Sequence, residues 1–117
     1  MSDSARPWRL YVDDMIGFAE KVLAYTAGMD QAAFVADSLV YDASLRNIEL
    51  IGEAATRVPQ TVRTAHPDLP WRLMVATRNR LIHAYLGIDN DTLWSIVVTD
   101  LPALLPKLRE LRLCAPA

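Results

Sequence analysis

Apolar residues recur at every third or fourth position along most of the chain, which is the pattern of amphipathic helices. Three stripes have this spacing: Trp8, Tyr11, Met15, Phe18, Val22 and Tyr25; Val40, Ser44, Ile48, Ile51, Ala55 and Val58; and Trp94, Val97, Leu101, Leu104, Leu108 and Leu111. A further helix is predicted from Trp71 to about Leu86, because Pro70 suits the start of a helix. Sustained alternation and Asn-Gly or Asp-Gly hairpin turns, the signals of strands, are missing from the sequence.

Residues that end or cap helices lie between these stripes. The expected boundaries are an end at Gly28, a cap at Asp30, ends at Pro59 and Gly87, and a cap at Asp89 or Asp91. Phe34 is expected in a short turn of its own, and another short turn is expected around 62–65. Because proline removes a backbone hydrogen bond, we expect a kink or break at Pro102 and Pro106.

These elements predict an all-α fold, a four-helix up-and-down bundle with an additional short helix. The length of 117 residues suits one domain, so residues 1–117 are taken as a single domain. The first and last helices have wide apolar faces with several large side chains. Such faces are often covered by a partner, which predicts a homodimer, with a higher oligomer as the alternative.

Composition narrows the class of protein. Hydrophobic residues make up 52% of the chain and charged residues 22%, which excludes an intrinsically disordered protein. The net charge of -2 argues against nonspecific coating of duplex DNA, so any contact with nucleic acid needs a local basic patch. The single cysteine, Cys114, cannot form an internal disulfide. With no signal-peptide pattern and no apolar run of membrane-spanning length, a cytoplasmic protein without membrane contact is expected.

The stretch from Thr77 to Asp89, TRNRLIHAYLGID, concentrates the reactive polar side chains. On an ideal helix Asn79 and His83 are four residues apart and can touch, whereas Arg78 and His83 point about 140° apart. Arginine is long enough to reach around the helix. Alternatively, two copies of the helix pack across a dimer axis and pool their arginine and histidine residues.

This set of residues suits RNA cleavage without a metal ion. Histidine can take the proton of the 2'-hydroxyl or protonate the leaving 5'-oxygen near neutral pH. An arginine fork can stabilise the charge that grows on the phosphate, and Asn79 can orient the imidazole or bind the phosphate. Two histidines and one cysteine without zinc-type spacing argue against a metal site, and we expect no cofactor.

Other polar residues are assigned by position. Arg80, Arg46 and Arg72 are candidate RNA contacts, with an ion pair as the alternative for Arg80. Gly52, a glycine within a helix, predicts close packing with a neighbouring helix. Glu49 and Glu53 are expected to be structural or ion-paired, including with the basic stretch, and Asn47 is expected to share a cleft with Arg46.

The pattern Arg78-Asn79-x-x-x-His83-x-Tyr85 resembles the Arg-x4-His-x-Tyr motif of HEPN-domain toxins, specifically the HepT-like branch. The segments LRNIELIGEAA (45–55), PWR (70–72), LW (93–94) and DLPALL (100–105) resemble the same family in the same order. The resemblance implies a dimeric α-helical ribonuclease toxin with Arg78 and His83 as its catalytic pair and Asn79 beside them. It also implies a partner, an MNT-type nucleotidyltransferase antitoxin that adds AMP to Tyr85 and so blocks RNA.

Other interpretations of the same residues stay open at this stage. His83 is alternatively a satisfied core histidine, Arg78 a surface ion pair, and Tyr85 a packing aromatic with an exposed hydroxyl. HEPN domains also serve as non-catalytic helical modules that bind and support a nucleotidyltransferase, or as nucleotide-binding sensors. Toxicity that depends on His83 would fit only the ribonuclease.

Overall fold

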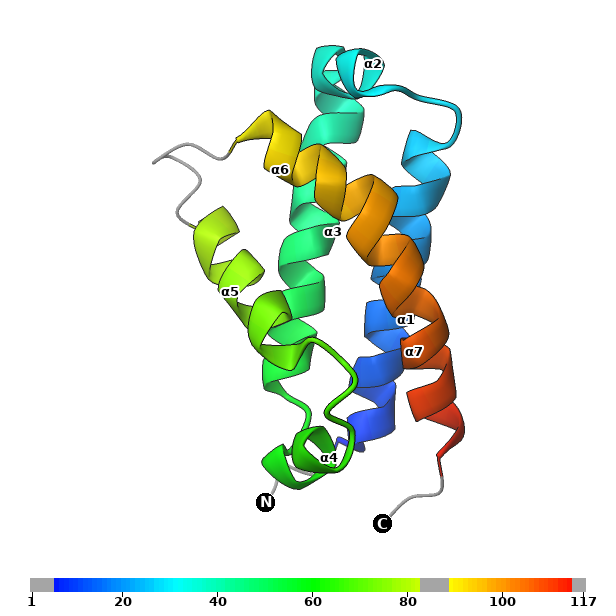
Figure 1. The fold of residues 1–117 in the computed structure, drawn as a ribbon, viewed down its shortest axis with the longest axis vertical. Helices are drawn as coiled ribbons and strands as arrows, with labels where there is room; N and C mark the ends of the chain where they lie inside the picture. The colour runs from blue at the N-terminus through cyan, green and yellow to red at the C-terminus, as the bar shows by residue number, and fades with distance from the viewer. Residues whose placement is uncertain (1–5, 83–88, 115–117) are drawn as a thin grey trace.

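The helices expected from the apolar spacing are present in the structure, a computed structural model that describes residues 6–82 and 89–114 (Figure 1). In chain order they are α1 (Trp8–Thr26), α2 (Gln31–Ala36), α3 (Ser38–Thr56), α4 (Gln60–Ala65), α5 (Trp71–Ile82), α6 (Asn90–Ser95), the π-helical turn η3 (Ile96–Asp100) and α7 (Leu101–Leu113). These two ranges hold no strand, so the all-α prediction is confirmed. The six-residue helices α2 and α4 lie where short turns were expected at Phe34 and around 62–65. Helix α6, also of six residues, continues directly into η3 and α7.

The longer helices run side by side and alternate in direction along the chain (Figure 1). Helix α3 packs against α1 and α5, and α1 also packs against α7. The buried positions of the three apolar stripes meet in one core, in which Val12, Met15, Ala55 and Leu108 are almost inaccessible to solvent. Because α5 packs mainly on α3, the polar residues of α5 are positioned by α3.

The turn from α1 to α2 follows from two residues. Gly28 has φ +79°, a left-handed conformation that glycine adopts readily, and the Met29 amide donates to the Thr26 carbonyl at 3.0 Å. Asp30 then caps α2, because its carboxylate accepts from the Ala33 amide at 2.8 Å. The predicted helix end and the predicted cap are both confirmed.

Phe34 joins α2 to the second half of the chain. It is fully buried, and its ring centroid lies 5.3 Å from that of Tyr41 and 5.2 Å from that of Trp94. The Tyr41 hydroxyl donates to Asn90 Oδ1 at 2.8 Å. These contacts anchor the start of α6, which follows the reactive stretch in sequence, to α2 and α3.

The last helical region departs from its prediction at the prolines. Of the kink or break expected at Pro106, the break is excluded, because the helix continues through this residue. The irregularity lies just before Pro102, where the Leu101 amide donates to the Ile96 carbonyl five residues back, within the π-helical turn η3. Proline has no amide hydrogen, so Pro102 cannot donate the usual helical hydrogen bond to the Val98 carbonyl four residues back. The widened turn at this point accommodates the missing hydrogen bond. Among the described helices, none is both long and apolar enough to cross a membrane.

Candidate active site

Helices α3 and α5 meet with almost no space at Gly52. A Cβ atom at this position would overlap Arg78 Cβ and would lie 2.6 Å from the carbonyl oxygen of Met74. Only a glycine therefore allows α5 to approach α3 this closely. The prediction that Gly52 serves close helix packing is confirmed, and its contact proves to be the helix turn that carries Arg78.

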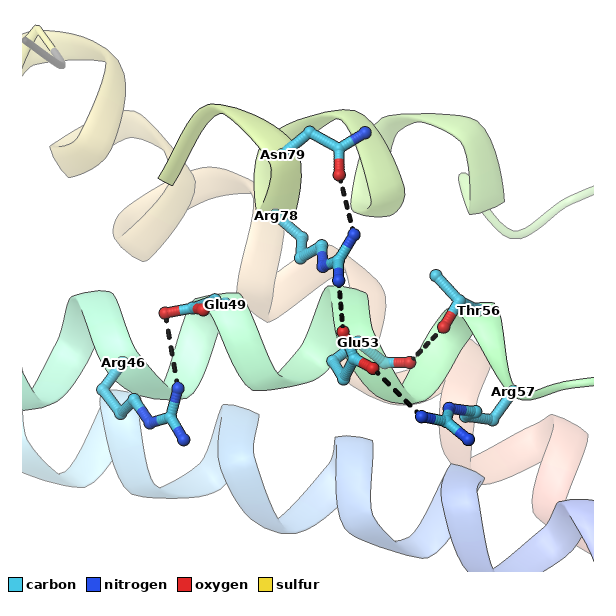
Figure 2. Close-up of polar contacts among 7 residues, drawn as sticks. All are labelled: Arg46, Glu49, Glu53, Thr56, Arg57, Arg78 and Asn79. Carbon is cyan, nitrogen blue, oxygen red and sulfur yellow. Dashed lines mark hydrogen bonds and ion pairs between the residues drawn. The ribbon is translucent and has the colours of Figure 1, made fainter. Parts of the chain in front are cut away.

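This close approach places Arg78 against a carboxylate of α3. One terminal nitrogen of Arg78 lies 2.6 Å from Glu53 Oε1, and the other donates to Asn79 Oδ1 at 2.9 Å (Figure 2). Charge-assisted contacts of this kind fix the plane of a guanidinium. The Arg78 side chain is 28% exposed, and its buried Nε has no hydrogen-bond partner among the described residues. Two contacts therefore orient the guanidinium, while part of the Arg78 side chain stays open to solvent.

The charge around Arg78 is not neutralised. Glu53 also pairs with Arg57, whose terminal nitrogen lies 3.4 Å from Glu53 Oε2 (Figure 2). Two guanidinium groups thus share one carboxylate, which leaves the cluster with one net positive charge. A cationic cluster with an oriented guanidinium suits an anionic group such as a phosphate.

The other expected RNA-contacting residues lie at different places. Arg72 and Asn79 both line one groove between α4 and α5. Arg80 lines a separate cleft of about 340 Å³ between α5 and the α6–η3 segment. Arg46 lies seven residues before Glu53 on α3 and is paired with Glu49 at 3.5 Å (Figure 2). The structure therefore brings Arg72 near Asn79 but leaves Arg46 apart from the Arg78 cluster.

Asn47 does not share an open cleft with Arg46, which corrects that expectation. Asn47 is buried, and its side-chain amide donates to the Ala43 carbonyl within α3 at 2.8 Å. Its hydrogen-bonding capacity is thus used inside the helix. An ion pair was the alternative for Arg80, but no carboxylate lies within salt-bridge distance of Arg80 in the described part of the chain.

His83 and Tyr85 lie outside the described residues, so their assigned roles stay predictions. Residues 6–82 and 89–114 contain no group of three or more histidine, cysteine or acidic side chains that could hold a metal ion. One residue was missed at the sequence level: Arg63 of α4 lines the same groove as Arg72 and Asn79. Whether Arg63 faces this groove depends on the path of residues 66–70, which connect α4 to α5. No pattern in the sequence predicts that path.

Comparison with known proteins agrees with the resemblance found in the sequence. The family described as "Ribonuclease HepT-like" matches residues 15–111. A Thermococcus cleftensis protein named "Probable ribonuclease HepT" is 36% identical over 102 residues, which cover 87% of this chain and 93% of that protein. "Putative RNase MJ1380" of Methanocaldococcus jannaschii is 36% identical over 99 residues, covering 85% and 91%. No solved structure matches the chain significantly.

Proposed function

This chain belongs to the ribonuclease HepT-like family, and from that premise we propose that it is an endoribonuclease that cuts RNA without a metal ion. The observation that carries the proposal is the orientation of the Arg78 guanidinium by its contacts to Glu53 and Asn79. In this proposal Arg78, Asn79 and His83 form the catalytic set. Arg80, Arg72 and Arg46 are proposed to contact RNA outside the bond that is cut.

The proposed reaction uses the RNA's own hydroxyl. The 2'-oxygen attacks the adjacent phosphorus, the bond from phosphorus to the 5'-oxygen breaks, and a 2',3'-cyclic phosphate forms. One histidine accepts the proton of the 2'-hydroxyl, and one donates a proton to the leaving 5'-oxygen. A homodimer, which we also propose, would supply two copies of His83 for these two roles.

Arg78 is proposed to stabilise the charge that grows on the phosphate oxygens. Its fork matches two oxygens of a phosphate and does not lose its proton. Glu53 and Asn79 fix the orientation of that fork before substrate binds, so little reorganisation accompanies the reaction. Glu53 is thus a positioning residue that acts through Arg78.

The biological setting follows from the same family. We propose a toxin of a bacterial or archaeal toxin–antitoxin system, formed by a single cytoplasmic domain and neutralised by an MNT-type nucleotidyltransferase. AMP added to Tyr85 would bring negative charge and bulk close in sequence to Arg78, which would compete with RNA for the same cation.

Modification of Tyr85 predicts a defined mass change. Protein coexpressed with its proposed cognate nucleotidyltransferase should gain mass in multiples of one AMP unit, and Tyr85→Phe should remove that gain. Intact-protein mass spectrometry measures both. Added mass that persists in Tyr85→Phe would show that the modified residue is another one.

The proposed ribonuclease activity is tested with unmodified protein and an end-labelled RNA in EDTA. We expect cleavage of the RNA, no cleavage of the all-deoxy oligonucleotide of the same sequence, and no cleavage at a single 2'-deoxy position placed at the cut site. Chelator should not reduce the rate. Strong inhibition by EDTA, or cleavage of the deoxy oligonucleotide, would contradict a mechanism that relies on the 2'-hydroxyl.

A non-catalytic role has one observation in its favour. The Arg78–Glu53 pair at 2.6 Å is also what a purely structural ion pair between α3 and α5 would look like. In that case the chain would bind and support its nucleotidyltransferase without cutting RNA. Toxicity on expression that is abolished by His83→Ala fits only the ribonuclease.

A further inference from the structure

A groove of about 1020 Å³ runs along the side of α5 that faces α4. Its polar residues are Gln60, Arg63 and Thr64 of α4 together with Arg72 and Asn79 of α5. Apolar side chains, including Leu69, Trp71 and Val75, form the rest of its lining. Because Asn79 bonds to Arg78, one end of this groove adjoins the cluster described above.

The arginines of this groove differ from most others in the chain. Six arginines of the described residues have a carboxylate partner: Arg6, Arg46, Arg57, Arg78, Arg109 and Arg112. Arg63 and Arg72 have none within the described ranges, and Arg63 Nε is buried there without a hydrogen-bond partner. Two guanidinium groups in one groove are thus left available for an anion.

The charge of this part of the chain is opposite to that of the whole. Residues 60–82 contain four arginines and one aspartate, a formal charge of +3, whereas the full chain carries -2. Basic charge is therefore concentrated on α4 and α5. Of the four arginines, Arg63 and Arg72 line the groove, and they supply the local basic charge that a net-acidic protein needs in order to bind a polyanion.

We propose that the groove binds single-stranded RNA on one side of the scissile phosphate, with Arg63 and Arg72 on backbone phosphates. This inference rests on the proposed ribonuclease function and adds a substrate-binding site to it. Arg72 and Asn79 are seven residues apart on α5, about 10 Å along the helix axis. At that separation, Arg72 is assigned to a different phosphate from the one that is cut.

The lining favours a single strand over a duplex. Unpaired bases expose apolar faces, which pack on apolar side chains and on guanidinium planes. The groove offers apolar surface for bases through residues such as Val75, and its two arginines are left for the backbone phosphates. A duplex would hide its base faces and would leave the apolar lining without a partner.

The test measures RNA binding in a background that should not cut. Fluorescence anisotropy of a labelled short single-stranded RNA of mixed sequence is recorded in EDTA at several salt concentrations, with all proteins carrying His83→Ala. Arg63→Ala with Arg72→Ala is expected to weaken binding at least about 10-fold. The slope of log affinity against log salt should fall by about 1.4, about 0.7 for each lost phosphate contact.

Two controls separate the groove from general charge. Arg112→Ala removes one positive charge on α7, where Arg112 pairs with Asp13 at 3.5 Å, and should leave binding nearly unchanged. Arg63→Lys with Arg72→Lys keeps the charge and should restore most of the salt slope. In the active protein, the double alanine variant should raise KM and largely retain kcat.

Three results would overturn the proposal, and a fourth would separate it from the proposed catalysis. Unchanged affinity in the double alanine variant, with wild-type protein still cutting RNA, would remove the groove from substrate binding and leave the ribonuclease function standing. An equal loss of RNA affinity in Arg112→Ala would show that the effect comes from net charge and not from the groove. If both arginines are needed to capture the nucleotidyltransferase but not RNA, the groove is a protein-binding surface. Groove-dependent RNA binding without any cleavage by the wild type would support the groove and contradict the proposed catalysis.

Discussion

Arg78→Ala is expected to reduce RNA cleavage about 100- to 1,000-fold, the loss typical of removing one preorganised donor from developing charge. Arg78 has one terminal nitrogen 2.6 Å from Glu53 and the other on Asn79, so its fork is already oriented. Folding should be largely retained, because a partly exposed ion pair contributes about 1 kcal/mol or less. Single-turnover cleavage and circular dichroism measure the two effects.

Conservative variants separate charge from geometry at this position. Arg78→Lys keeps the charge but cannot hold Glu53 and a phosphate with a planar fork, so a large loss is expected here too. Arg57→Ala is the matched control, since it removes the other arginine on Glu53 without touching the proposed catalytic group. Because it also removes the net positive charge of the cluster, it should lower the rate, but much less than Arg78→Ala does. Equal losses in Arg57→Ala and Arg78→Ala would indicate that cluster charge, not the Arg78 fork, matters.

Gly52→Ala is expected to destabilise the fold by about 1–3 kcal/mol, although alanine is the better helix former. The new methyl group would overlap Arg78 Cβ and would meet the Met74 carbonyl oxygen at 2.6 Å. A backbone oxygen cannot rotate away, so α5 must move from α3 and carry Arg78 with it. A fall in melting temperature of roughly 4–12 °C should accompany a loss of cleavage.

Gly17→Ala provides the matched control in α1. A Cβ atom at Gly17 would meet nothing within 4 Å, so the substitution should raise stability by up to about 1 kcal/mol and leave cleavage unchanged. Thermal unfolding of the two variants side by side gives the comparison. If Gly52→Ala proves as stable and as active as Gly17→Ala, the close contact of α3 and α5 is not needed for the site.

Local chemistry explains why much of the fold could be predicted. Gly28 and Asp30 act on residues within a few positions of themselves, and the structure places the turn and the cap where they were expected. Pro70 precedes α5 as predicted. The widened turn before Pro102 was harder to foresee, because a proline can be accommodated by a kink, a break or a π-helical turn.

The candidate site shows where sequence reasoning stops. Gly52 indicated a close neighbour, but that neighbour, Arg78, lies 26 positions away and is selected by the packing of α5 on α3. Glu49 and Glu53 are four residues apart on one helix face, and only the axial placement of α5 pairs Arg78 with Glu53 and leaves Glu49 to Arg46. Arg63 reaches its groove through a loop path that no local pattern specifies.

The end group of the cleaved RNA tests the central claim most directly. Unmodified wild-type protein and His83→Ala are incubated with the same labelled RNA in EDTA, and the products are identified by mass. The account predicts 2',3'-cyclic phosphate ends from the wild type and a rate at least about 100-fold lower for His83→Ala, with its helicity intact. Cleavage by His83→Ala at the wild-type rate, or failure of both proteins to cut several RNAs, would contradict it.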